Sequence, residues 1–170
     1  MSVRVREARP DERARIGELT RAAYAEYART MQPDAWAALE SALRSSLSDD
    51  TGLTRLVAEL DGVVVGSAAL YAPGIDAYGS LASRTDWPEV RLVAVAPTAR
   101  GRGIASALVD ECARRARRAG ATTLGLHTST SMAAARRLYE RMGFIRDAAS
   151  DFQPPGAELV EGYRLSLADQ

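Results

Sequence analysis

The sequence predicts a single α/β domain in which helices cover a mixed β-sheet. Segments with strand and helix patterns alternate along the chain, and Asp61-Gly62 joins two β-rich segments, which predicts an antiparallel hairpin. The chain has 170 residues, of which 46% are hydrophobic and 26% are charged. These values are typical of an ordinary folded domain with its own core, so we expect residues 1–170 to form one domain.

The first half of the chain is expected to contain three strands and two helices. The strands follow from alternating or β-branched residues, and the helices from apolar residues that recur every three or four positions. The predicted strands are residues 3–6, 53–60 and 63–71. The first predicted helix follows Pro10-Asp11 and ends at residue 28. The second spans residues 33–48. The two-residue turn at Asp61-Gly62 is typical of a type I′ hairpin.

The second half is expected to contain four strands and two helices. The predicted strands are residues 89–95, 122–127, 144–146 and 161–167. One helix is expected to begin within residues 100–105 and to end at Gly120, and the other to end at Gly143. Residues 73–88 show no periodicity and predict a long loop, a feature that is often functional in a compact domain.

Composition excludes several function classes. The 22 basic and 22 acidic side chains cancel, so no net charge attracts nucleic acid or an anionic membrane. Every basic residue is arginine, and the absence of lysine excludes a Walker P-loop and Schiff-base catalysis. Cys112 and His127 are the single cysteine and histidine, too few for a disulfide or a zinc site of soft ligands, so no metal is expected. No apolar segment approaches the roughly 20 residues that span a bilayer, which indicates a cytoplasmic protein.

The segment from Val93 to Leu108 carries the clearest chemical signal. A strand leads into a turn with Gly101 and Gly103 and then into a helix, whose N-terminal N–H groups and dipole favour a phosphate. The alternative to a phosphate site is that Gly101 and Gly103 only allow a tight turn between the strand and the helix. A Rossmann turn would require glycine or alanine at Ser106 and an acid about 20 residues later, so dinucleotide binding is disfavoured.

This loop resembles the pyrophosphate loop of the GNAT superfamily of acetyl-CoA-dependent N-acetyltransferases. The family pattern is Gln/Arg-x-x-Gly-x-Gly/Ala, and the chain has Arg-Gly-Arg-Gly-Ile-Ala at 100–105. Two further segments resemble the family in the right order: residues 89–97 its fourth strand, and residues 135–144 the helix before its sixth strand. The resemblance is sharp over residues 89–146, about a third of the chain.

The resemblance implies a fold and a cofactor. The fold is a mostly antiparallel, twisted sheet with a central parallel pair, flanked by about four helices. The fourth strand would pair with the pantetheine arm of acetyl-CoA, the loop would wrap its pyrophosphate, and Arg102 could add a charge-assisted contact. The cofactor-binding residues implied in this way are Val93, Ala94, Val95, Arg100, Gly101, Arg102, Gly103, Ile104, Ala105 and Ser106.

Two catalytic residues are implied by the same resemblance. Glu89 occupies the position at which some members carry the glutamate that takes the amine proton, directly or through water. Tyr139 matches the tyrosine that donates a proton to the departing thiolate. His127, which titrates near neutrality, is the alternative base. Met132 stands where many members have asparagine, so we expect Ser129, Thr130 or Ser131 to supply any polar contact there.

The implied reaction is transfer of an acetyl group from acetyl-CoA to a primary amine by direct attack, through a tetrahedral intermediate. The acceptor is a small molecule or a peptide, with no nucleic acid or membrane involved, and a homodimer is a further possibility. Two alternatives stay open: an acyl-CoA-binding sensor with little catalysis, and a nucleotide-binding module. Acids together with aromatic residues would suit a cationic amine. The expected acceptor walls carry Tyr24, Tyr27, Trp36, Asp76, Tyr78, Trp87, Asp151, Phe152 and Glu158.

Overall fold

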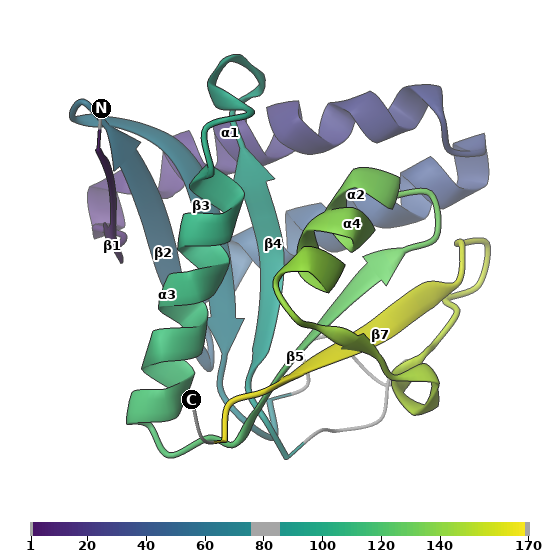
Figure 1. Ribbon diagram of the computed structural model, residues 1–170. Helices are drawn as coiled ribbons and strands as arrows, with labels where there is room; N and C mark the ends of the chain where they lie inside the picture. Colours follow the sequence, from purple (N-terminus) through teal and green to yellow (C-terminus); the bar gives the residue numbers. More distant parts are fainter. Residues whose placement is uncertain (1, 76–85, 169–170) are drawn as a thin grey trace.

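The computed structural model describes residues 2–75 and 86–168, and seven strands in these ranges form one sheet (Figure 1). The order across the sheet is β1-β2-β3-β4-β5-β7-β6. Only β4 and β5 are parallel; the other neighbouring pairs are antiparallel. The predicted mixed, mostly antiparallel sheet with one central parallel pair is therefore confirmed. The strands are β1 Val3–Glu7, β2 Leu53–Leu60, β3 Val63–Tyr71, β4 Glu89–Val95, β5 Thr123–Ser129, β6 Ile145–Arg146 and β7 Val160–Ser166.

Within the described residues, four α-helices cover the sheet, two on each face (Figure 1). They are α1 Arg13–Tyr24, α2 Pro33–Ser48, α3 Ile104–Arg118 and α4 Ala133–Arg141. Leu19 of α1 and Leu43 of α2 pack on one face, against Ala94 and Leu92 of β4. Leu108 of α3 packs on the other face, in the main core. In the described ranges, no helix combines the length and the apolar character needed to cross a bilayer.

The first predicted helix is shorter than expected. The sequence predicts a helix to residue 28, but α1 ends at Tyr24 and a 3-10 helix, Ala25–Arg29, follows. The carbonyl of Tyr27 accepts hydrogen bonds from the backbone N–H groups of Thr30 and Met31. The tighter winding of residues 25–29 brings the chain to Gln32, which is extended, as the residue before a proline prefers to be.

The hairpin of β2 and β3 has the predicted turn. Asp61 has φ 52° and Gly62 has φ 81°, the two positive angles that a type I′ turn requires. Leu60 and Val63 pair directly across this turn. The turn thus fixes the register next to it, and a bulge between Ala58 and Glu59 shifts the register by one residue farther along the hairpin.

Cys112 lies in the main core between α3 and the sheet, as its place on the apolar helix face predicts. It is fully buried together with Leu108, Val109 and Leu124. Burial raises the pKa of the Cys112 thiol to about 12, so the thiol stays protonated near neutral pH. This cysteine packs as a small apolar residue.

Candidate active site

The parallel strands β4 and β5 separate soon after they begin (Figure 1). In the described part of the chain they pair only at Glu89 with Gly125 and at Val90 with Leu126. On its other edge β4 continues to pair with β3 as far as Val95. At Val93, Ala94 and Val95, the edge of β4 that faces β5 therefore has no strand partner among the described residues, and an extended ligand could pair with the backbone there.

A β-bulge in β4 accompanies this separation. Arg91 pairs with Ala69 but Ala94 pairs with Ser67, so β4 has one more residue than β3 over this stretch. Leu92 in the bulge has φ 58°, a rare angle for a residue with a side chain. Arg91 lies over the Tyr71 ring and Leu92 packs in the same cluster as Tyr71, so two consecutive side chains lie on the same face of the sheet.

A cleft of about 600 Å³ opens where the strands separate, and we call it the inter-strand cleft. Its walls come from β4, the loop before α3, α4 and the end of α1. Of the ten residues predicted to bind the cofactor, all except Arg102 line this cleft: Val93, Ala94, Val95, Arg100, Gly101, Gly103, Ile104, Ala105 and Ser106. The structure thus brings the strand and the loop of the sequence motif to one cavity.

The loop before α3 presents backbone to the inter-strand cleft. Gly101 has φ 76° and Gly103, which caps α3, has φ 74°; both angles are strained for residues with a side chain. A Cβ atom at either position would meet no protein atom within 4 Å. The first N–H groups of α3 have no partner within the helix, so they and the positive end of the dipole are suited to an anionic group.

The two arginines of this loop have different surroundings. Arg100 bonds Glu26 at 2.5 Å and the carbonyl oxygen of Ala23 at 3.3 Å, which ties the loop to the end of α1. Arg102 is exposed and does not line the inter-strand cleft. The guanidinium of Arg100 therefore holds the loop in place, whereas the backbone around the glycines faces the cleft.

Tyr139 of α4 lines the inter-strand cleft and is 7% exposed. Its ring packs edge to face against Phe144, with ring centres 5.8 Å apart. Burial raises the pKa of the Tyr139 hydroxyl far above its ordinary value, and the nearby tyrosines Tyr24 and Tyr27 raise it further. The hydroxyl therefore keeps its proton throughout the physiological range and can donate a hydrogen bond to a ligand in the cleft.

Glu89 and His127 form a buried pair at the beginning of the split between β4 and β5. Oε2 of Glu89 lies 3.1 Å from Nδ1 of His127, and their side chains are 8% and 4% exposed. Nε2 of His127 lies 2.8 Å from the carbonyl oxygen of Ser150. Because that oxygen can only accept, Nε2 carries the proton of the neutral imidazole, and Nδ1, which faces Glu89, is the nitrogen that can take up another.

The position of Glu89 depends on a close approach by Gly125. A Cβ atom on Gly125 would lie 2.5 Å from Nε1 of Trp87 and 3.2 Å from Oε1 of Glu89. Glycine there leaves room for the indole and the carboxylate. Glu89 lines neither of the two cavities described here, whereas His127 lines both.

A second cavity of about 430 Å³, the side pocket, lies between α2, the end of β5 and the loop that precedes β7. It shares part of its lining with the inter-strand cleft. The shared residues are Tyr24, Arg91, Leu92, His127, Thr128 and Met132. The two cavities therefore meet at these residues, which we call the junction.

The residues expected to form the acceptor walls are distributed differently from the prediction. Tyr24, Phe152 and Glu158 line the side pocket, but Tyr27 lines the inter-strand cleft. Trp36 packs against the cluster of Met31, Ala35 and Met132. Asp151 forms hydrogen bonds with Arg146 and with the backbone N–H of Gly162, and Trp87 lies against Gly125. Asp76 and Tyr78 lie outside the described residues.

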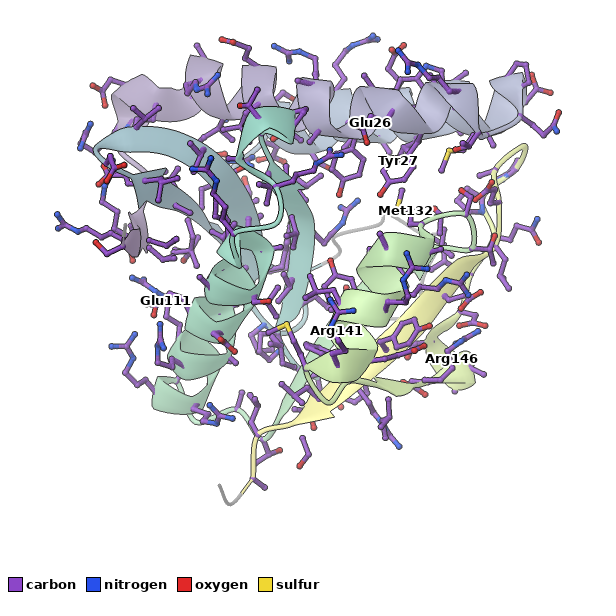
Figure 2. The ribbon with its side chains drawn as sticks, turned by 45° about the horizontal axis from the view of Figure 1, so that its top comes forward. Glu26, Tyr27, Glu111, Met132, Arg141 and Arg146 are labelled. Carbon is purple, nitrogen blue, oxygen red and sulfur yellow. The ribbon has the colours of Figure 1, made fainter. Side chains whose placement is uncertain are left out.

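Met132, which replaces the family's asparagine, caps α4 at the junction. It is 7% exposed and packs with Met31 and Ala35 of the α1–α2 side. Figure 2 shows Met132 and Tyr27 approaching each other from opposite sides of the gap. Of the suggested substitutes, Ser131 lines the inter-strand cleft but bonds Glu158, and Ser129 lines the side pocket.

Sequence reasoning missed Thr128 at the junction. This residue is 5% exposed, and its Oγ1 atom has no hydrogen-bond partner among the residues that the structure describes. Its place two residues after Leu126 in a strand predicts only an inward side chain. Nothing in the sequence indicates that the hydroxyl would remain unpaired.

Comparison with known proteins identifies the family of this chain. Residues 15–144 match the model of the acetyltransferase (GNAT) family. A search of curated proteins finds no match. Among solved structures, a GNAT family acetyltransferase from Brucella melitensis in complex with acetyl-CoA is 24% identical, with a TM-score of 0.60, over 99% of this chain and 90% of the other.

Two further solved structures have the same fold. The PaiA N-acetyltransferase from Thermoplasma acidophilum, in complex with coenzyme A, is 15% identical with a TM-score of 0.68, over 97% of this chain and all of the other. The ribosomal-protein-S18-alanine N-acetyltransferase from Escherichia coli is 17% identical with a TM-score of 0.67, over 99% and 96%. The predicted GNAT-like fold is confirmed, and the family model covers most of the described sheet and helices. The chain belongs to the acetyltransferase (GNAT) family.

Proposed function

We propose that residues 1–170 form one N-acetyltransferase domain, which transfers an acetyl group from acetyl-CoA to a primary amine. The observation that carries this proposal is the junction: a cleft with an open strand edge and a helix N-terminus meets a second pocket, and His127 lines both. The Brucella and Thermoplasma relatives were solved with acetyl-CoA and coenzyme A, which supports the choice of cosubstrate. A donor in one cavity and an acceptor in the other would react where the cavities join.

The residues around the inter-strand cleft suit the donor. The free edge of Val93, Ala94 and Val95 would pair with the amides of the pantetheine arm, as a neighbouring strand does. Residues 100–106 would receive the pyrophosphate at the N-terminus of α3. Arg100 serves this site by holding the loop against α1.

His127 is the group best placed to take the proton of the amine. It lines the side pocket, whereas Glu89 touches the site through His127. An imidazole that gains a proton here carries two N–H groups, and the structure supplies two acceptors for them: Glu89 and the Ser150 carbonyl. Glu89 is therefore a positioning residue that stabilises the imidazolium.

Tyr139 is the proposed donor to the leaving sulfur. As the amine nitrogen bonds the carbonyl carbon, a tetrahedral intermediate forms; its collapse breaks the carbon–sulfur bond and leaves a thiolate. The amine proton passes to Nδ1 of His127, directly or through water, and the thiolate accepts a hydrogen bond from the Tyr139 hydroxyl. The raised pKa of Tyr139 keeps the hydroxyl protonated and makes it a weak acid, so it stabilises the thiolate by a hydrogen bond and keeps its own proton.

Two measurements on the full chain test the proposal. Acetyl-CoA is expected to raise the melting temperature more than ATP or NAD at equal concentration. Coenzyme A release from acetyl-CoA is expected to depend on added amine and to produce acetylated amine in equal amount. Binding without turnover across a broad amine panel would instead indicate an acyl-CoA sensor, and stronger stabilisation by ATP or NAD would indicate a nucleotide-binding module.

A further inference from the structure

The side pocket is lined mostly by apolar residues, with Ser41, Ser45 and Ser46 of α2 among its polar groups. His127 and Thr128 lie at the junction, where the inter-strand cleft joins. Away from the junction, the lining comes mostly from α2 and from the loop before β7. An acceptor that reacts at the junction must therefore place the rest of its body against α2 and this loop.

Small residues on one face of α2 leave room for the side pocket. Ala35, Ala38 and Ala42 recur at steps of three and four, which places them on the same side of the helix, and all three line the side pocket. Leu39 and Leu43 line it beside them. An α2 with larger residues at these positions would fill much of a pocket of only about 430 Å³.

The opposite wall is also apolar. Phe152, Pro154 and Val160 line it, and the Phe152 ring lies edge to face with His127, with ring centres 5.2 Å apart. The apolar surface thus begins directly beside the proposed base. A hydrocarbon group attached within a few bonds of the reacting nitrogen would be removed from water there.

Acidic groups in this wall are scarce. Glu158 is the one carboxylate that lines the side pocket within residues 2–75 and 86–168. Its Oε2 atom already accepts hydrogen bonds from the Ser131 hydroxyl at 2.7 Å and the Ser131 backbone N–H at 3.2 Å. Among the described residues, a second ammonium group on the acceptor would find only this carboxylate, already hydrogen-bonded to Ser131, in a mostly apolar cavity that also contains the cationic Arg91, which is unfavourable.

We propose that the acceptor is a small primary amine carried on an apolar body, aryl or branched alkyl, with no second positive charge. This inference rests on the proposed function, and it departs from the sequence-based expectation that acidic and aromatic residues together hold a cationic amine. Amine and acetyl group meet at the junction, and the apolar body occupies the space beside Ala38 and Phe152. Polyamines and aminoglycosides are excluded from this class by their charge.

Two matched pairs of amines test this class by steady-state kinetics with acetyl-CoA. 2-Phenylethylamine and ethylamine differ in the apolar body, and butylamine and 1,4-diaminobutane differ in the second cation. We expect kcat/KM to be at least about tenfold higher for the first member of each pair, which corresponds to about 1.4 kcal/mol. Equal values in the first pair, or preference for the diamine in the second, would overturn the inference while leaving the proposed function intact.

Two variants of α2 test whether the preference for an apolar amine arises in the side pocket. Ala38→Phe fills the side pocket and is expected to lower kcat/KM for 2-phenylethylamine at least about tenfold, with a much smaller change for ethylamine. The control is Ala37→Phe: Ala37 is the preceding residue, is exposed and does not line the side pocket, so its substitution should change neither value. Equal effects of the two variants would overturn the inference.

Binding separates a failure of this inference from a failure of the proposed function. If none of the four amines is acetylated, their dissociation constants are measured by calorimetry on the chain saturated with coenzyme A. The same tenfold preferences, lost for 2-phenylethylamine in Ala38→Phe, would sustain the acceptor class although the proposed turnover fails. Absence of any preference among the four would overturn the acceptor class itself.

Discussion

The imidazole of His127 is held between two acceptors, with Nδ1 3.1 Å from Oε2 of Glu89 and Nε2 2.8 Å from the carbonyl oxygen of Ser150. This arrangement suits a histidine that carries both protons, the state reached after it takes a proton from the amine. Glu89 and His127 should therefore act as one unit in catalysis. Substitution of either should remove most of what the pair contributes.

Glu89→Gln and His127→Gln are each expected to lower kcat/KM by about 10²- to 10⁴-fold, the range of general base catalysis. The double variant should be little worse than either single variant, because the residues work together. In all three, the rising acid limb of the pH profile of kcat/KM should flatten.

An acceptor of different pKa supplies the control for this experiment. If the acid limb follows the pKa of the amine and persists in both variants, the limb reports the substrate, and a protein base is eliminated. Additive losses in the double variant would contradict the coupling of Glu89 with His127.

Tyr139→Phe keeps the ring that packs on Phe144 and removes only the hydroxyl. Turnover is expected to fall by about 10- to 10³-fold, because the thiolate loses its donor, with little change in the melting temperature. Since burial raises the pKa of Tyr139, wild type should show no loss of kcat from ionisation of this hydroxyl near its ordinary pKa of 10. Rapid-quench or steady-state rates with chemistry limiting would measure both effects.

Tyr163→Phe is the matched control for that variant. Tyr163 is 4% exposed and belongs to the same core cluster as Tyr139, but it lines neither cavity. Loss of the Tyr163 hydroxyl should leave turnover unchanged. If the two variants have equal turnover, Tyr139 is an ordinary core aromatic residue.

Gly103→Val is expected to abolish the rise in melting temperature caused by acetyl-CoA. The valine would adopt φ near 74° only with strain, and its side chain would occupy space in the inter-strand cleft where we place the pyrophosphate. Gly120→Val is the control, because Gly120 has φ 89°, also has no atom near its Cβ position, and does not line the cleft. Equal acetyl-CoA shifts in the two folded variants would show that the loop assignment is wrong.

Local patterns were sufficient to predict most of the sheet and the loop. Asp61-Gly62 specifies its own turn, and strands β2, β3 and β4 begin and end at the predicted residues, because turn chemistry and periodicity act over a few residues. Residues 100–106, except Arg102, line the inter-strand cleft where α3 begins at Ile104, and the sequence predicts the beginning of a helix within this segment. Each of these features depends on neighbours in the sequence.

The site depended on contacts between distant segments, and these were predicted less well. The pairing of Glu89 with His127 joins residues 38 apart, and the Ser150 carbonyl that completes it comes from a further loop. Periodicity in the sequence does not indicate contacts between distant segments. Sequence analysis therefore gives Glu89 and His127 as alternative bases and does not predict that they pair. The bulge at Leu92 and the unpaired hydroxyl of Thr128 likewise follow from tertiary packing.

Thr128→Val is expected to stabilise the fold by about 1 kcal/mol or to leave it unchanged. Valine has nearly the shape of threonine, and the buried Oγ1 atom that it removes has no hydrogen-bond partner in the structure. Urea unfolding at neutral pH would measure this difference. The control is Thr20→Val, because the Thr20 hydroxyl is equally buried but donates to the Ile16 carbonyl at 2.7 Å, so its loss should destabilise. Destabilisation of similar size in both variants would contradict the assignment of Thr128 as unpaired.

The last prediction concerns acid stability and lies far from the site, at the edge of the sheet. Glu12 is 7% exposed and accepts hydrogen bonds from both terminal nitrogens of Arg6, at 2.6 and 3.0 Å, and from the Arg9 backbone N–H at 2.8 Å. The bonds from Arg6 are the main reason that the pKa of Glu12 falls to about 2, against 4.5 in an unfolded chain. A carboxylate with a lowered pKa stabilises the fold fully above the unfolded value, and this contribution is lost as the pH falls from about 4.5 to about 2.

Glu12→Gln should therefore lower the free energy of unfolding by roughly 1–2 kcal/mol at pH 7, after allowance for solvent screening. The difference from wild type should shrink as the pH falls below 4.5, because the wild-type carboxylate then gains a proton. Urea unfolding of both proteins at several pH values between 7 and 2.5 measures it. Glu18→Gln is the control: Glu18 pairs with Arg15 at 3.2 Å but its side chain is 71% exposed, so its effect should stay below about 0.5 kcal/mol at every pH. A Glu12→Gln deficit that does not change with pH would show that lost packing, and not the charge of Glu12, is the cause.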